Sequence, residues 1–67
     1  MDVQGKYFMI VAVDSELVLD VKGGKKTPGS DVILWKKTGT DNQLWYEDYT
    51  GAVCSKHNTL CLDFNSK

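Results

Sequence analysis

The sequence predicts an all-β fold, and three observations lead to this prediction. Short segments rich in β-branched and aromatic residues recur along the 67 residues of the chain. Turn-forming residues such as Gly, Asp, Asn, Ser and Thr separate these segments. No apolar stripe with the 3.6-residue period of a helix is present. Short strands joined by glycine-rich turns are typical of β-sandwiches and β-barrels.

Each predicted strand is bounded by turn residues. In chain order the strands cover residues 7–13, 17–21, 32–37, 43–49, 52–55 and 60–64. The turns cover residues 14–16, 23–30, 38–42, 50–51 and 56–59. A chain of 67 residues forms one domain at most and has a small core. Scaffolds of this size usually rely on a disulfide, a metal or other chains, and we expect oligomerisation to provide this support.

An internal repeat is visible in the sequence. The segment LVLDV at 17–21 matches LCLDF at 60–64 at an offset of 43 residues. In each repeat a predicted strand comes before this segment, and a glycine, Gly5 or Gly51, precedes that strand. This period predicts one full repeat over about residues 5–48 and part of a second over about 49–67. A repeat that cannot close its own hydrophobic face needs neighbours to cover it. Either other chains supply these neighbours, or the chain is a fragment.

Charge and hydropathy argue against two classes of partner. Eight lysines against nine acidic residues give a formal net charge of -1, and the chain has no arginine, the usual residue for contacts to phosphate and base edges. We therefore expect no nucleic-acid partner. The longest apolar run, 8–13, is too short to cross a bilayer and lacks the flanks of a signal peptide. No membrane insertion is expected.

The residues with reactive side chains do not form an active site in the sequence. Cys54 and Cys61 lack the spacing of a zinc or redox motif, and they are either two unpaired buried thiols or a disulfide across a hairpin. Glu47 and Asp48 are adjacent on a strand and would point to opposite faces, which does not suit acid and base acting on one bond. No nucleophile with a histidine and an acid, and no metal-ligand cluster, is recognisable. The sequence predicts no enzyme, no metal and no cofactor.

Four sequence elements occur in register between residues 17 and 45. They are LVLDV at 17–21, Gly29, VILW at 32–35 and DNQLW at 41–45. Their order and spacing resemble one repeat of the ricin B-type lectins, which closes with a Gln-x-Trp triplet, here Gln43-Leu44-Trp45. The resemblance covers about residues 5–64 and implies a β-trefoil, in which three repeats surround a pseudo-threefold axis. We therefore expect a β-trefoil-like segment with one full four-stranded repeat and half of a second, completed by other chains.

The resemblance also implies a sugar site. Asp20 would accept hydrogen bonds from two adjacent hydroxyls, Trp35 would stack on the apolar face of the sugar, and Asn42 would bridge a hydroxyl with its amide. Gln43 would steady Asp20 or the loop from behind, while Leu44 and Trp45 belong to the core. The implied function is a lectin module that binds galactose-like glycans through one shallow site per chain, within a homo-oligomer or with other trefoil segments.

Each site residue also has a purely structural interpretation. Asp20 at the end of an apolar strand can cap a turn, and Trp35 can be a core or interface aromatic. Asn42 lies in a Thr-Gly-Thr-Asp-Asn turn, where it can simply tolerate left-handed dihedrals. Many family repeats that bind sugar carry a polar residue two positions before the aromatic, but this chain has Ile33 there. The alternative function is therefore a structural or protein-interaction trefoil segment that binds no sugar.

Other positions depart from the family pattern or stay outside the predicted site. Val18 and Lys37 stand where many repeats pair cysteines, and the expected partner of Cys61 would lie beyond the end of the chain. Asp63 repeats Asp20, but no counterpart of Trp35 and no Gln-x-Trp triplet follows it. His57 is expected to be a solvated loop residue. Three loop lysines near Gly23 and Gly24 lack the spacing of a phosphate loop and are interpreted as solvated charge: Lys22, Lys25 and Lys26.

Overall fold

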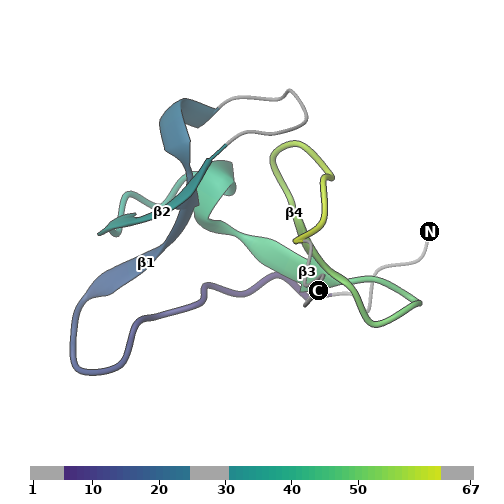
Figure 1. The fold of residues 1–67 in the computed structure, drawn as a ribbon, viewed down its shortest axis with the longest axis horizontal. Helices are drawn as coiled ribbons and strands as arrows, with labels where there is room; N and C mark the ends of the chain where they lie inside the picture. Colours follow the sequence, from purple (N-terminus) through teal and green to yellow (C-terminus); the bar gives the residue numbers. More distant parts are fainter. Residues whose placement is uncertain (1–5, 25–30, 63–67) are drawn as a thin grey trace, which may run out of the picture.

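The computed structural model describes residues 6–24 and 31–62. In these ranges the chain forms only short strands and single 3-10 turns, so the all-β prediction is confirmed (Figure 1). The elements are β1 (Leu17–Val21), η1 (Lys22–Gly24), β2 (Val32–Lys36), η2 (Asp41–Gln43), β3 (Trp45–Glu47) and β4 (Val53–Ser55). Several residues used in the sequence predictions lie outside the described residues: Gly5, Lys25, Lys26, Gly29, Asp63 and Phe64.

The β1–β2 hairpin positions most of the predicted motif. The two strands are antiparallel, from the pair Leu17 and Lys36 to the pair Val21 and Val32. Side chains of directly opposed residues lie on the same face of a hairpin. Four alternate residues therefore share one face: Val18, Asp20, Ile33 and Trp35.

The β3–β4 hairpin is the second antiparallel pair, with Trp45 opposite Ser55 and Glu47 opposite Val53. The turn between its strands is organised by the Asp48 carboxylate, whose Oδ1 accepts hydrogen bonds from Thr50 N at 2.8 Å, Thr50 Oγ1 at 2.6 Å and Ala52 N at 3.0 Å. The Thr50 hydroxyl is the main cause of a lowered pKa of Asp48, because these bonds favour the charged carboxylate.

The segment before β1 joins the two hairpins, and it runs between β1 and β3 in Figure 1. It pairs at isolated points, Phe8 with Trp45 and Val11 with Val18, rather than as the continuous strand predicted over 7–13. That prediction was wrong in extent, because one half of the segment pairs with β3 and the other half with β1. Likewise, the predicted strand 43–49 shortens to β3, since Gln43 belongs to η2.

Backbone contacts recur at the offset of the sequence repeat. Val11 pairs with Val18, and 43 residues further along Cys54 pairs with Cys61. The flanking hydrogen bonds recur at the same offset: Leu19 N to Ile10 O with Leu62 N to Val53 O, and Ala12 N to Leu17 O with Ser55 N to Leu60 O. Leu17 and Leu60, the first residues of the two repeated segments, therefore follow turns that are closed by the same backbone hydrogen bonds.

Cys54 and Cys61 form a disulfide. The alternative of two unpaired buried thiols was therefore wrong, and so was the expectation that the partner of Cys61 lies beyond the end of the chain. Only Cys54 is buried, and Cys61 is exposed. The two sulfurs also lie near the Asp48 carboxylate, but sulfurs bonded to each other offer no thiolate to a metal.

The core of the described residues is small and partly polar. Its apolar members are Val18, Val21, Trp45 and Cys54, and Asp20, Gln43 and Ser55 are buried with them. The Trp45 indole Nε1 donates a hydrogen bond to Leu19 O at 3.2 Å, which ties β3 to β1. Trp45 is a core residue as predicted, whereas Leu44 is only half-buried. The described residues contain no helix with the length and apolar character needed to cross a bilayer.

Candidate functional site

An open depression of about 420 Å³ lies at the end of the β1–β2 hairpin. Its walls come from β1, η1, β2, the turn after β2, and η2. Three of the four predicted site residues line it, and Gln43 lies behind them. The lining residues are Asp20, Lys22, Gly23, Ile33, Trp35, Thr38, Thr40 and Asn42.

Asp20 is the acidic group of the depression and is only 4% exposed. Its Oδ1 accepts a hydrogen bond from Asn42 Nδ2 at 3.2 Å, and its Oδ2 accepts one from Gln43 Nε2 at 2.8 Å. Both partners lie on η2, more than 20 residues away, so Asp20 joins a tertiary network in addition to ending a strand. An ionised carboxylate has about four lone-pair positions, so two remain for hydroxyl donors.

Gln43 connects three parts of the site from a fully buried position. Its Nε2 donates to Asp20 Oδ2 and to Lys36 O at 2.7 Å, and its Oε1 accepts from Thr38 N at 2.8 Å. Both amide hydrogens are used, so the side chain has no donor left for a ligand. Gln43 therefore positions Asp20 and the end of β2 rather than contacting the contents of the depression.

Asn42 lines the depression from η2, where it lies at hydrogen-bonding distance from Asp20. Its Nδ2 donates to Asp20 Oδ1 and to Val21 O, both at 3.2 Å, and its Oδ1 accepts from the Thr40 hydroxyl. Left-handed dihedrals are not the reason for this residue, because the non-glycine residues with positive φ in the described ranges are Asp14 and Thr59. The two bonds of Nδ2 are long, so a hydroxyl acceptor that enters the depression can replace one of them at small cost.

Trp35 supplies the aromatic surface. It lies on β2 opposite the fully buried Val18, yet its own side chain is 49% exposed on the wall of the depression. The interpretation of Trp35 as a core aromatic was therefore wrong. An exposed indole beside polar groups offers a flat apolar face of the kind that ligand rings stack on.

Other lining residues were partly or wholly missed by the sequence predictions. Ile33 lies directly opposite Asp20 and brings an apolar side chain to the wall, as its position in the motif indicated. Thr38 and Thr40 were missed. Their hydroxyls share a hydrogen bond of 2.7 Å, and Thr40 continues it to Asn42. The only signal in the sequence was the placement of two threonines around Gly39, directly before Asn42.

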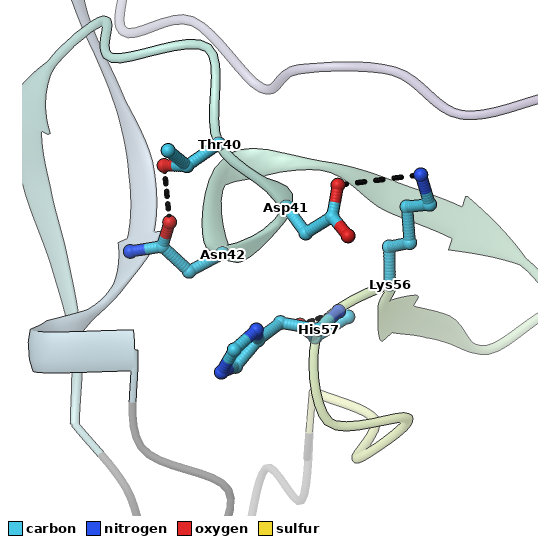
Figure 2. A network of polar contacts seen from close by, with 6 residues as sticks. Thr40, Asp41, Asn42, Lys56 and His57 are labelled. Atoms are coloured by element: carbon cyan, nitrogen blue, oxygen red, sulfur yellow. Dashed lines mark hydrogen bonds and ion pairs between the residues drawn. The ribbon is translucent and has the colours of Figure 1, made fainter.

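The turn after β4 contacts both η1 and η2, and Figure 2 shows Lys56 of this turn paired with Asp41 on η2. His57 Nε2 lies at hydrogen-bonding distance from Gly24 O on η1, and its ring is half-buried. The expectation of a solvated loop residue was therefore wrong, because tertiary folding brings η1 against this turn. The neighbouring Lys56 Nζ forms an ion pair of 3.3 Å with Asp41 Oδ1 on η2.

Comparison with known proteins relates this architecture to sugar-binding folds. All residues, 1–67, match the family described as ricin-type beta-trefoil lectin domain-like. Among solved structures, the chain is similar to the crystal structure of the earthworm R-type lectin C-half in complex with GalNAc, with 38% identity and a TM-score of 0.75. The match covers 81% of this chain and 44% of that chain, so this chain spans less than half of that lectin structure. Curated protein sequences give no match.

Proposed function

The chain belongs to the ricin-type β-trefoil lectin family, and on this premise we propose that it is a carbohydrate-binding module for galactose-like sugars with one shallow site per chain. The observation that carries the proposal is the convergence of Asp20, Asn42 and an exposed Trp35 on one open depression. A sugar needs acceptors, donors and an apolar platform in the same place, and these three side chains supply them. Fold and family favour binding rather than catalysis.

Each residue has a distinct role in the proposed complex. Asp20 accepts hydrogen bonds from two adjacent hydroxyls, and its charge makes these bonds stronger than neutral ones. Trp35 stacks on the less polar face of the sugar ring. Asn42 exchanges one of its 3.2 Å bonds for a bond to a sugar hydroxyl. The GalNAc ligand of the similar earthworm lectin supports the choice of a galactose-like sugar.

Titration calorimetry with galactose and GalNAc tests this proposal. Asp20→Asn keeps the volume of the side chain but removes its charge and turns an amide donor toward the donating amide of Asn42 or Gln43. We therefore expect binding to be lost together with part of the stability, and binding is measured below the melting transition of the variant. Glu16→Gln changes an exposed carboxylate at the far end of β1 and serves as the matched control. Unchanged binding by the Asp20→Asn variant would refute the assigned site.

The alternative function, a structural or protein-interaction segment, is favoured by one observation. Ile33 places an apolar side chain opposite Asp20, where a polar residue would give the sugar another contact. Ile33→Gln distinguishes the two functions by the change of tryptophan fluorescence on adding galactose. We expect a signal in the natural protein and tighter binding in the variant. No signal from either folded protein at millimolar sugar would establish the alternative.

We also propose that further trefoil repeats cover the apolar surface, supplied by a second copy of the chain or by other trefoil segments. Large apolar side chains are exposed in the described residues, and Leu17 and Leu34 line a second open depression beside Trp35. Linked sites would raise weak monovalent affinity by about two to four orders of magnitude. Sedimentation equilibrium tests for a second copy, and Leu34→Ser is expected to shift the equilibrium toward the monomer. A monomeric natural protein would exclude self-association and leave other trefoil segments as the cover.

A further inference from the structure

We propose that two neighbouring residues after β4, Lys56 and His57, hold the two walls of the sugar depression at their working separation. We call this pair the Lys56–His57 clasp. The inference rests on the proposed function, because it concerns the same depression. It assigns a positioning role to residues that do not line the depression and that follow the Gln-x-Trp triplet by more than ten positions.

The walls need such support because both are single 3-10 turns with little buried surface. The η1 turn contributes Lys22 and Gly23 to the depression and has no buried residue. The η2 turn contributes Asn42, and Gln43 is its only buried member. Local segments with few buried contacts open at low free-energy cost. Hydrogen bonds of Asn42 and Gln43 join η2 to the end of β1, and contacts from another element add to them in setting the separation of η1 and η2.

His57 holds the η1 wall. Its Nε2 contacts Gly24 O, and since a carbonyl oxygen only accepts, Nε2 carries the proton. The base of the residue is fixed as well, because His57 N donates to Ser55 Oγ at 3.0 Å and Ser55 is buried. A Cβ added at Gly24 would lie 3.6 Å from His57 Nε2, so ring and turn pack closely. The His57 ring therefore links η1 to the buried end of β4.

Lys56 holds the η2 wall. Its Nζ lies 3.3 Å from Asp41 Oδ1 and 4.7 Å from the centre of the Tyr7 ring. Asp41 is the residue before Asn42 in the sequence. Its backbone N donates to Leu44 O at 3.0 Å, just after η2. Figure 2 shows the Lys56 side chain directed toward Asp41 and the His57 ring directed away from it. Two adjacent residues thus contact η1 and η2, the two turns that contribute Gly23 and Asn42 to the depression.

The equivalent turn of the first repeat shows that the fold itself does not require this pair. Val13 and Asp14 occupy the places 43 residues before Lys56 and His57, in a turn flanked by the same backbone hydrogen bonds. Val13 is 86% exposed, and Asp14 is exposed too. The same flanking hydrogen bonds therefore close a turn that has no lysine and no histidine. Their contacts to η1 and η2 are specific to the side of the molecule that carries the depression.

Substitutions of each residue, followed by calorimetry with GalNAc, test the clasp. His57→Ala is expected to weaken binding about fivefold, the scale of one lost hydrogen bond, with an almost unchanged melting temperature. His57→Gln keeps an amide donor for Gly24 O and should recover most of the affinity. Lys56→Met should weaken binding about twofold, as expected for an exposed ion pair, and should remove part of its salt dependence. Lys37→Met is the matched control for an exposed lysine outside the depression.

A second measurement separates the clasp from the proposed function. Amide NMR shifts of Gly23 and of the Asn42 side chain, recorded without sugar, should move in His57→Ala and Lys56→Met respectively and return in His57→Gln. If these shifts move while the natural protein binds no sugar, the clasp stands and the proposed function fails. Shifts identical to those of the natural protein, or equal affinity losses in His57→Ala and His57→Gln, would overturn the clasp.

Discussion

Two turns 43 residues apart share their flanking backbone hydrogen bonds but are held in place by different chemistry. Around β1, Val11 pairs with Val18, and the strand is tied to the rest of the molecule by the buried hydrogen bonds of Gln43. At the equivalent place beside β4, Cys54 and Cys61 are covalently linked. The part that carries the depression therefore depends on a polar network, and the other part depends on a disulfide. This difference predicts which substitutions destabilise each part.

The largest effect is expected from breaking the polar network. Gln43→Leu leaves Asp20 Oδ2, Lys36 O and Thr38 N without the partner that they have now. Asp20 is buried and charged, whereas the bonds of the other two groups are part-buried, and we expect a loss of about 3 kcal/mol in the free energy of unfolding. Urea denaturation followed by tryptophan fluorescence measures this loss. A loss below about 1 kcal/mol would show that the network is not what holds the first part together.

A smaller effect is expected from removing the disulfide. The Cys54→Ser and Cys61→Ser double variant releases a loop with a sequence separation of seven residues. The chain-entropy relation gives a loss of about 2.5 kcal/mol for a loop of this size. Urea denaturation of the natural protein with and without reductant provides the matched comparison. The free energy of sugar binding should change less than the free energy of unfolding. A loss of binding equal to that of Asp20→Asn would contradict the division into a part held by the polar network and a part held by the disulfide.

The smallest effect concerns the Asp48 turn and its dependence on pH. The pKa of Asp48 is lowered from 3.8, chiefly by the Thr50 hydroxyl, so the folded state holds the carboxylate charged more strongly than the unfolded state. The stabilising contribution is therefore complete above the unfolded value and is lost as pH falls through the lower folded pKa. Melting temperatures between pH 5 and pH 2.5 should fall less in Asp48→Asn than in the natural protein. Parallel pH profiles would show that this carboxylate does not support the turn.

Much of the fold and of the candidate site was predictable because its signals are local. The strand at 17–21 and the strand over 32–36 follow from β-branched residues between turns. The motif then located Asp20, Trp35 and Asn42, which the structure brings to one depression. Their contact with a sugar stays a prediction. The continuous strand over 7–13 failed because pairing with two different partners interrupts it.

Residues whose roles depend on distant partners were not predictable in the same way. His57 stands in a polar turn sequence, and nothing near it in the chain indicates Gly24, which lies 33 residues away. The hydroxyls of Thr38 and Thr40 acquire a role only because tertiary folding brings Asn42 to Asp20, to which it donates a hydrogen bond. The pairing of the two cysteines stayed open because spacing alone does not show which side chains face each other.

The amino-acid sequence by itself determined the strand and turn pattern, the 43-residue repeat and the family motif, because these depend on neighbouring residues and on spacing along the chain. Only the tertiary structure decided that Cys54 bonds to Cys61, that Gln43 is buried between three partners, and that Lys56 and His57 contact η2 and η1. The physical reason is that each of these contacts requires a particular packing of separate segments, and side-chain chemistry acts only over the few ångströms that this packing sets.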